Sequence, residues 1–210
     1  SRVIRIGAQP QPPGRLAPAL VLGPRVSLDE EARDGAETVE IRTALTPPGH
    51  VTAVAWTLLT PVDRSMSAGL KLMGASNVAE GIAAGADFLA PSQNVTMIDR
   101  ETIALKTFGA MPRRDATHQT FGRLPAPGWR KENLWMGFEA YAANPEFVSP
   151  SGGIVGNTNN KMIERPFPLH VSWEWGDSQR VQRLQKLMQT RAVHTRESFM
   201  EAQLDTVSVT

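Results

Sequence analysis

The sequence has no cysteine among its 210 residues, so it can form no disulfide, thiolate nucleophile or zinc–thiolate site. No run reaches the roughly 18–20 apolar residues that a membrane-spanning helix needs. The first residues, SRVIRIG, lack the apolar core of a secretory signal. Charge of one sign is also absent, because 22 Lys and Arg are balanced by 21 Asp and Glu. The charge balance therefore gives no electrostatic basis for binding nucleic acid or an anionic membrane.

What the sequence does contain is many turn-forming residues, 17 Gly and 16 Pro, beside a 41% hydrophobic fraction. This composition is typical of one large domain with much irregular backbone. No internal boundary is evident, so residues 1–210 are treated as a single unit. The chain begins without Met and stops just after a helical pattern, and we expect it to be a portion of a longer protein.

Strand and helix signals both occur along the chain. A run that is apolar on both faces, residues 50–61, is typical of a buried central strand. The segment 112–150 shows no sustained period and is predicted to be mostly loop, covering a site or a partner. The other predicted strands are residues 2–7, 19–28, 38–45, 152–157 and a hairpin over 93–112 that turns at 99–101. The predicted helices are 63–74, 78–90, 177–189 and one starting after Thr195.

The helix ends carry capping signals. Gly74 is a candidate C-cap, and Asn77 with Glu80 forms a candidate capping box. Asp177 or Ser178 would cap the third helix and Thr195 the last. Two apolar stripes follow from the helical period: Met66, Leu70 and Met73 in the first helix, and Val181, Leu184, Leu187 and Met188, predicted to face inward, in the third.

Most motifs that carry chemistry are missing. The four histidines, His50, His118, His170 and His194, show no metal-ligand spacing, so we expect no metal site. There is also no nucleophile-elbow serine, phosphate-binding loop or dinucleotide glycine pattern.

Two features leave alternatives open. Asn157, Asn159 and Asn160 lie within four positions, and asparagines there can serve turn geometry, or one amide can point into a site and bind developing negative charge. Arg180 falls in the first turn of a predicted helix, where the macrodipole disfavours a cation. It is either a solvated surface arginine or a residue kept for function.

The stretch PSGGIVGNTNNK, followed by PFPLHVSWEWGDSQRVQRLQKLM, resembles the large-subunit core of the penicillin acylase family. These N-terminal nucleophile hydrolases cleave amides. The family pattern is Asn-x-Asn-Asn and then Gly-x-x-x-Arg, which here is Asn157-Thr158-Asn159-Asn160, Gly176 and Arg180. VAWTLL, QNVTMIDRETIALKTFGAMPRR and GRLPAPGW match in order, so the resemblance covers about residues 35–210 and, more weakly, the first 34.

The resemblance implies an α+β fold, with this chain forming part of a four-layer αββα sandwich. It implies that Asn159 is an oxyanion-hole donor and that Arg180 orients the surroundings of the nucleophile and favours negative charge. Thr158 replaces an aromatic residue of some members, which bears on the substrate pocket. The parent would hydrolyse a linear amide of a small molecule, such as a penicillin or an acyl-homoserine lactone. The alternative is a non-catalytic fragment or binding module on the same scaffold.

Ser1 matches the residue type of the family nucleophile, an N-terminal serine, but not its context. Ser1-Arg2-Val3-Ile4 departs from the family start, and the interval to Asn159 is too short. We therefore expect the nucleophile in a remaining large-subunit segment, with a small subunit as further partner, in the periplasm or secreted. Calcium occurs in some members, but the aspartate expected before the Arg180 helix has no counterpart, so no cofactor is predicted.

Overall fold

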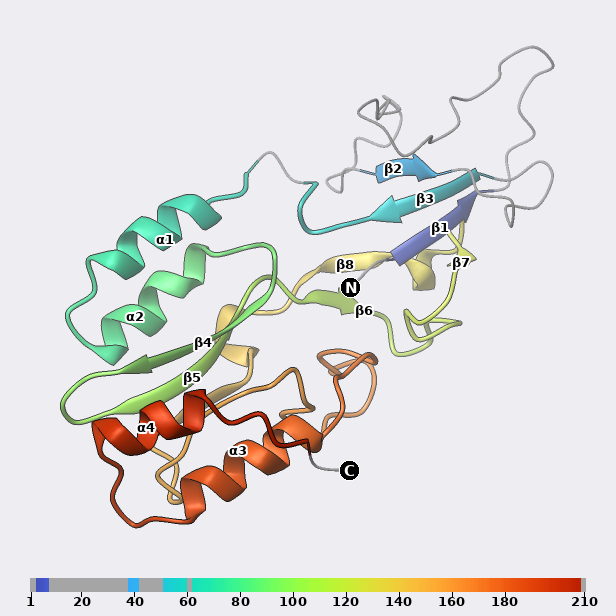
Figure 1. Cartoon of the computed structure of the whole chain (residues 1–210). Helices are drawn as coiled ribbons and strands as arrows, with labels where there is room; N and C mark the ends of the chain where they lie inside the picture. The colour runs from blue at the N-terminus through green and yellow to red at the C-terminus, as the bar shows by residue number, and fades with distance from the viewer. Residues whose placement is uncertain (1–2, 8–37, 42–50, 60–61, 209–210) are drawn as a thin grey trace.

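The computed structural model describes residues 3–7, 38–41, 51–59 and 62–208. Ser1, His50 and the strand predicted over 19–28 lie outside the described residues. Within them the chain forms helices and small, mostly antiparallel sheets, as the α+β prediction requires (Figure 1). No helix of the described ranges is both long and apolar enough to cross a membrane.

The first sheet has the strand order β2–β3–β1–β7 (Figure 1). Its strands are β1 Val3–Gly7, β2 Thr38–Ile41, β3 Val51–Ala55 and β7 Ala126–Pro127. β3 pairs antiparallel with both β1 and β2. The prediction that the apolar run near residue 54 forms an interior strand is therefore confirmed.

The second sheet contains the predicted hairpin, β4 Gln93–Ile98 and β5 Ile103–Phe108, followed by β9 Glu146–Val148. The strand order is β4–β5–β9, and all pairs are antiparallel. At the hairpin turn the Asp99 carboxylate accepts the backbone N–H groups of Val78, Glu101 and Thr102. These bonds hold the pKa of Asp99 below its usual range, so the turn is closed by a charged acceptor.

Residues 112–150 are mostly loop, as predicted, but short strands and helical turns that the prediction did not place interrupt the loop. β6 Pro112–Arg114 pairs with β8 Trp135–Phe138, β7 and β9 join the larger sheets, and two short helices, η3 Lys131–Asn133 and η4 Tyr141–Ala143, lie between them. Each strand spans only two to four residues. Strands this short show no readable period, because their stability comes from partners distant in the sequence.

Helices α1 Ser65–Met73 and α2 Val78–Ala84 form in the expected places, and α1 ends at Gly74. The second prediction was too long, because a single 3₁₀ turn, η2 Gly85–Asp87, follows α2 and the chain then becomes extended. The backbone N–H groups of Leu89 and Ala90 donate to the Ser65 hydroxyl and are thus drawn out of the helix.

The cap of α2 is confirmed with one change. The Asn77 side chain accepts the N–H of Glu80, as predicted. The Glu80 carboxylate bonds the N–H of Ser76, one residue before the position that a strict capping box uses.

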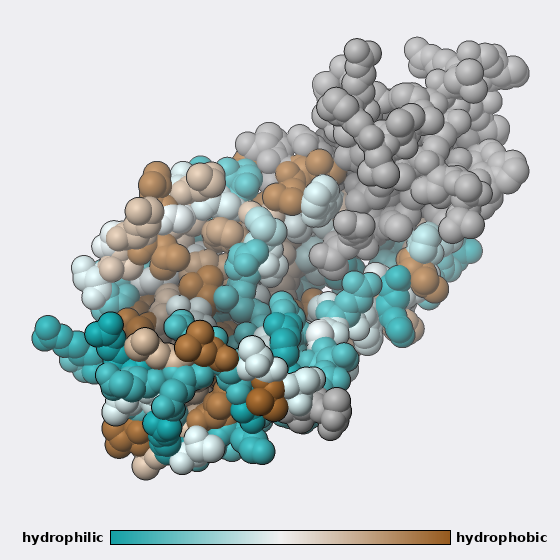
Figure 2. Space-filling model, in the orientation of Figure 1, coloured by the Kyte–Doolittle hydropathy of each residue, from teal (hydrophilic) through white to brown (hydrophobic). Residues whose placement is uncertain are grey.

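The apolar stripe of α1 faces outward. Met66, Leu70 and Met73 are 86%, 71% and 84% exposed, whereas Ala68 on the opposite side is 2% exposed. Figure 2 shows hydrophobic surface over α1. Within the described part of the chain nothing covers this stripe, and α1 packs through its opposite side, where Ala68 is buried and Leu72 lies close to Gly81 of α2.

The C-terminal helices are α3 Gln179–Gln189 and α4 Arg196–Gln203. Thr195 and Ser198 form the predicted cap of α4, here as a complete capping box. Ser178 occupies the N-cap position of α3, but its side chain makes no capping bond. The four apolar residues predicted to face inward on α3, Val181, Leu184, Leu187 and Met188, are half-buried.

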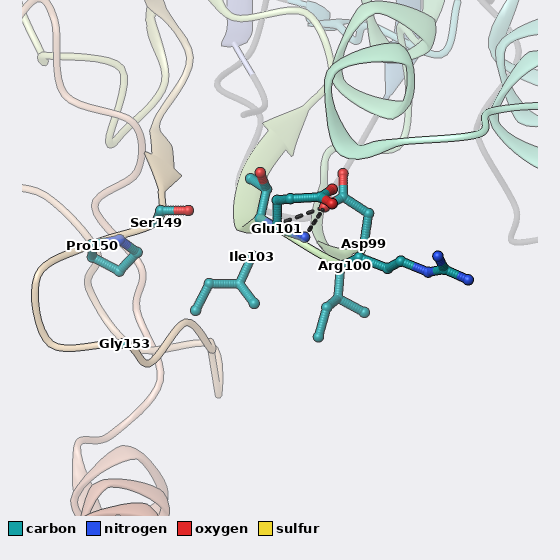
Figure 3. Close-up of a pocket in the computed structure, with 9 residues that line it drawn as sticks. Asp99, Arg100, Glu101, Ile103, Ser149, Pro150 and Gly153 are labelled. Carbon is teal, nitrogen blue, oxygen red and sulfur yellow. Dashed lines mark hydrogen bonds between the residues drawn. The ribbon is translucent and has the colours of Figure 1, made fainter.

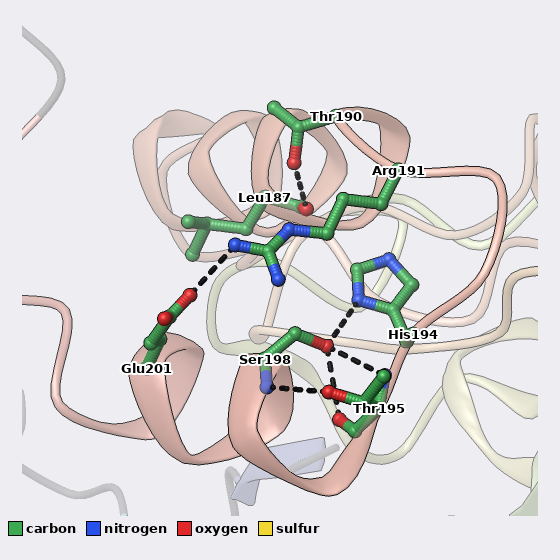
Figure 4. Close-up of polar contacts among 7 residues, drawn as sticks. All are labelled: Leu187, Thr190, Arg191, His194, Thr195, Ser198 and Glu201. Carbon is green, nitrogen blue, oxygen red and sulfur yellow. Dashed lines mark hydrogen bonds and ion pairs between the residues drawn. The ribbon is translucent and has the colours of Figure 1, made fainter.

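Polar side chains join α3 to α4 (Figure 4). The His194 imidazole lies between the Met188 carbonyl at 2.9 Å and the Ser198 hydroxyl at 3.1 Å, and Arg191 pairs with Glu201. A second ion pair joins Arg183 to Asp205. Helices α3 and α4 are therefore joined by specific polar contacts, in addition to the packing of the half-buried apolar face of α3.

The centre of the second sheet is β5, which is buried on both faces. Lys106 is 1% exposed, yet its charge is satisfied. Its ammonium lies 3.2 Å from the Glu146 carboxylate, donates to the Asn144 carbonyl at 3.1 Å and sits 4.7 Å from the centre of the Tyr141 ring. A buried cation of this kind is tolerated because every face of the ammonium has a partner.

Gly85 marks the tightest contact between the helices and β5. A Cβ at this position would lie 2.4 Å from both Phe108 Cε1 and the Tyr141 hydroxyl, whereas one at Gly69 in α1 would meet nothing within 4 Å. We predict that Gly85→Ala lowers the free energy of unfolding by about 1–3 kcal/mol through overpacking. Gly69→Ala should raise it by about 0.5–1 kcal/mol, because alanine is the better helix former. Urea denaturation of both variants checks the pair, and equal stabilities would contradict the packing described for Gly85.

Candidate active site

The three clustered asparagines lie in a loop, so the strand predicted over 152–157 is wrong. After β9, Ser149 has φ 41° and Gly153 has φ 66°, and these left-handed residues turn the chain away from the sheet. Residues 154–157 then belong to no helix or strand and pair with no strand in the described part of the chain. The amides are therefore held by side-chain hydrogen bonds.

Two of the asparagines serve turn geometry. Asn157 Oδ1 accepts the N–H of Asn159 at 2.9 Å, and Asn157 Nδ2 donates to the Asn160 carbonyl at 3.1 Å. Asn160 Oδ1 in turn accepts the N–H of Thr158 at 3.0 Å. Asparagine is suited to such bonds with its own turn.

Asn159 is held differently. Its φ is 68°, a left-handed conformation that asparagine tolerates better than most residues. Its carbonyl accepts the N–H of Gly176 at 2.6 Å, and its side-chain Oδ1 accepts a bond of 2.7 Å from the Arg180 guanidinium. Arg180 also donates to the Thr158 carbonyl at 2.6 Å. The structure thus brings the two predicted site residues into direct contact.

The contact with Arg180 fixes which end of the Asn159 amide is free. A guanidinium only donates hydrogen bonds, so the amide must present its oxygen to Arg180 and its NH₂ group elsewhere. Asn159 is exposed, and among the described residues nothing accepts a bond from its Nδ2. The result is an oriented, unpaired N–H donor at the surface of this chain.

The spacing Gly-x-x-x-Arg now has a physical reason. A Cβ at Gly176 would lie 3.1 Å from both the Cβ and the carbonyl oxygen of Asn159, so a side chain there would push Asn159 away. Four residues later, Arg180 is the second residue of α3, about one helical turn further. Gly176 therefore holds the backbone of Asn159, and Arg180 holds its side chain.

One residue of this arrangement was not predicted from the sequence. Asn94 on β4 donates from Nδ2 to Asn157 Oδ1 at 2.9 Å, and its own Oδ1 accepts the Thr107 hydroxyl at 2.8 Å. A separation of 63 residues hides this contact from any local pattern. The only signal was the presence of Asn94 within a segment that matches the family.

A hollow of about 330 Å³ lies elsewhere, between the β4–β5 turn and the segment from Ser149 to Gly153 (Figure 3). It sits at the end of β4 opposite to Asn94, roughly 13 Å along the strand at the usual rise per residue. The Asp99 carboxylate at its rim is already bonded to backbone N–H groups. The hollow is therefore separate from the Asn159 site.

Two of the histidines, His118 and His170, lie close together in the structure. His118 and His170 both pack against Phe167, with ring centres 6.3 and 5.1 Å apart, a proximity that their spacing did not predict. Burial and the nearby Arg114 charge lower the pKa of both, that of His170 to about 4, so both are neutral at pH 7. No group of three or more His, Cys, Asp or Glu in the described ranges could hold a metal ion.

Comparison with known proteins gives the family. The family model for penicillin amidase matches residues 23–210. The acyl-homoserine lactone acylase QuiP of Pseudomonas syringae pv. tomato is 28% identical over 160 residues, which are 75% of this chain and 18% of that protein. The penicillin acylase 2 proenzyme of Pseudomonas sp. (strain SE83) is 30% identical over 63 residues, 30% of this chain and 8% of that protein.

A solved structure has the same fold. The thermostable penicillin G acylase from Alcaligenes faecalis overlays on 96% of this chain with a TM-score of 0.63 at 18% identity, and the match covers 33% of that chain. This likeness confirms the predicted fold, of which this chain supplies a part. The match covers less than a fifth of the length of each of the two acylases named above. With nearly all of its described residues inside the match, this chain belongs to the penicillin amidase family.

Proposed function

We propose that this chain is part of an amide hydrolase in which Asn159 donates a hydrogen bond to the oxyanion. The observation that carries the proposal is the orientation of the Asn159 amide, whose oxygen is held by Arg180 and whose NH₂ group is unpaired within the described residues. Family membership supports the reaction class, because the named relatives are acylases.

The chemistry follows from that orientation. When a nucleophile attacks an amide carbonyl, the oxygen gains negative charge, and a donor already in place stabilises it without reorganisation. Loss of one such donor typically costs about 2.7–4 kcal/mol of transition-state stabilisation. Two further features favour negative charge on that oxygen. The guanidinium of Arg180 contacts the Asn159 side chain, and the positive end of the α3 dipole lies at the same place.

The substrate class that we propose is a linear amide of a small molecule. One relative is named for acyl-homoserine lactones and another for penicillin. Either class of substrate is compatible with a donor that binds only the carbonyl oxygen of the amide. The predicted location, in the periplasm or secreted, remains a proposal that rests on the resemblance alone.

We also propose that Ser1 is not the nucleophile. The family match begins at residue 23, after Ser1, and the sequence around Ser1 departs from the family start. The nucleophile would then come from the remaining large-subunit segment of the parent, with the small subunit beside it. The alternative is a non-catalytic binding module on the same scaffold. In that case the full-length parent would also lack a nucleophile.

The first test concerns this chain alone. Incubated with phenylacetyl amides and acyl-homoserine lactones, it should show no turnover above that of a Ser1→Ala variant, because the nucleophile is elsewhere. The parent polypeptide should turn over at least one of these substrates, which a binding module would not. Turnover by the chain alone that depends on Ser1 would overturn the assignment.

The second test concerns Asn159 in the parent enzyme. Asn159→Gly keeps a residue that accepts φ 68° and removes the donor, while Asn159→Asp keeps the shape and the contact with Arg180. Both should lower kcat by roughly 10²–10³-fold with little change in KM, since the bond forms mainly in the transition state. Steady-state kinetics measures both constants. A raised KM with unchanged kcat would make Asn159 a ground-state binding residue.

The third test concerns Arg180, with Arg196 as the matched control. Both are exposed arginines in the first turn of a helix, but no side-chain bond of Arg196 is recorded in the described part of the chain. Arg180→Gln in the parent should lower kcat by up to about 10²-fold, because the Asn159 amide loses its anchor. Arg196→Gln should leave kcat unchanged.

Thermal melting separates function from structure in this third test. Each substitution removes a cation that opposes the macrodipole by about 0.3–1 kcal/mol, so the melting temperature should stay level or rise slightly. If Arg180→Gln instead keeps its activity and melts several degrees lower, Arg180 is a structural residue.

A further inference from the structure

We propose that Asn94 and Asn157 are positioning residues for the reaction and that they tie the oxyanion donor to the core of the sheet through Thr107. We refer to Thr107, Asn94 and Asn157 as the amide relay. The inference rests on the proposed role of Asn159 and extends it to residues that do not touch the substrate.

The hydrogen bonds of the amide relay run in one direction. The Thr107 hydroxyl donates to Asn94 Oδ1 at 2.8 Å, and Asn94 Nδ2 donates to Asn157 Oδ1 at 2.9 Å. The same Asn157 oxygen accepts the backbone N–H of Asn159 at 2.9 Å. Since that N–H can only donate, Asn157 must present its oxygen and Asn94 its NH₂ group. Each amide thus has one orientation that satisfies its neighbours.

The anchor of the amide relay is rigid, and its end is exposed. Thr107 is 4% exposed in β5, the middle strand of its sheet, and lies directly opposite Asn94 in the β4–β5 ladder. Asn94 lies on the exposed edge strand β4, and Asn159 is exposed as well. The amide relay therefore links a surface loop by hydrogen bonds to a buried residue of the sheet, which fixes the position of the loop.

The backbone of Asn159 needs this support. Its left-handed conformation, φ 68°, is sparsely populated for residues other than glycine and persists where the surroundings hold it. The bonds among Asn157, Thr158 and Asn160 are local to the loop, so they shape it without fixing its place relative to the sheet. The bond from Asn94 supplies that place. Without it, the Asn159 amide would be free to drift by the roughly 1 Å that costs up to about 10²-fold in rate.

The test uses the parent enzyme and the variant Asn94→Ala, with Thr96→Ala as the matched control. Thr96 lies two residues further on β4, is exposed on the same face of the strand, and makes no side-chain bond recorded in the described ranges. Asn94→Ala should lower kcat by about 10–100-fold while KM changes less than about 2-fold. Thr96→Ala should leave both constants unchanged. An unchanged kcat in Asn94→Ala would overturn the inference.

A double-mutant cycle with Asn159→Gly separates positioning from a general structural role. If Asn94 acts through Asn159, then Asn94→Ala should change kcat less than about 2-fold in the Asn159→Gly background. Additive losses would show that Asn94 acts otherwise and would overturn the amide relay while leaving the role of Asn159 intact. If Asn159→Gly itself keeps full kcat, the proposed function fails, and the relay fails with it.

The anchor gives an independent readout. Thr107→Ser keeps the hydroxyl that donates to Asn94, and Thr107→Val removes it with nearly the same volume. Thr107→Ser should keep the kcat of the unmodified enzyme. Thr107→Val should lower kcat by the same factor as Asn94→Ala. Melting temperatures of both variants monitor folding, and equal kcat values for folded Thr107→Ser and Thr107→Val would overturn the anchoring role.

Discussion

A strand buried on both faces must find a partner for every polar group it carries, and β5 imposes this constraint on much of the molecule. Lys106 is paired with Glu146 and with the carbonyl of Asn144. The Asn144 amide donates to the carbonyls of Thr107 and Gly109, so these backbone acceptors at the end of the strand have hydrogen-bond partners. β4 and β9, helix α2 and the turn at Tyr141 are all arranged around this strand.

The same constraint reaches the candidate site through Thr107. Its hydroxyl donates to the Asn94 side chain, and Asn94 donates in turn to the Asn157 side chain. The same Asn157 oxygen accepts the backbone N–H of Asn159. From the other side, Gly176 and Arg180 hold the carbonyl and the side chain of Asn159. One exposed amide is thus fixed by partners from three separate segments of the chain, which is the preorganisation that an oxyanion donor requires.

Two local features oppose stability at this point. Arg180 places a cation at the positive end of a helix, and Asn159 adopts a left-handed backbone. Neither helps the fold of an isolated segment, and both are held by the contacts that orient the amide. Such conflicts between local preference and observed structure are concentrated where chemistry is done.

The sequence by itself determined what short-range hydrogen bonds and helical period decide: the caps at Asn77 and Thr195, the Asp99 turn, the half-buried face of α3, and the motif that singled out Asn159 and Arg180. Tertiary structure alone decided the short strands between residues 112 and 148, the loop in place of a strand at 152–157, and the outward stripe of α1. It also placed Asn94 against Asn157, 63 residues away. The reason is physical: a cap or a turn is completed by residues within a few positions, whereas a two-residue strand, a face left uncovered or an amide bonded across the sheet takes its energy from partners that no local pattern identifies.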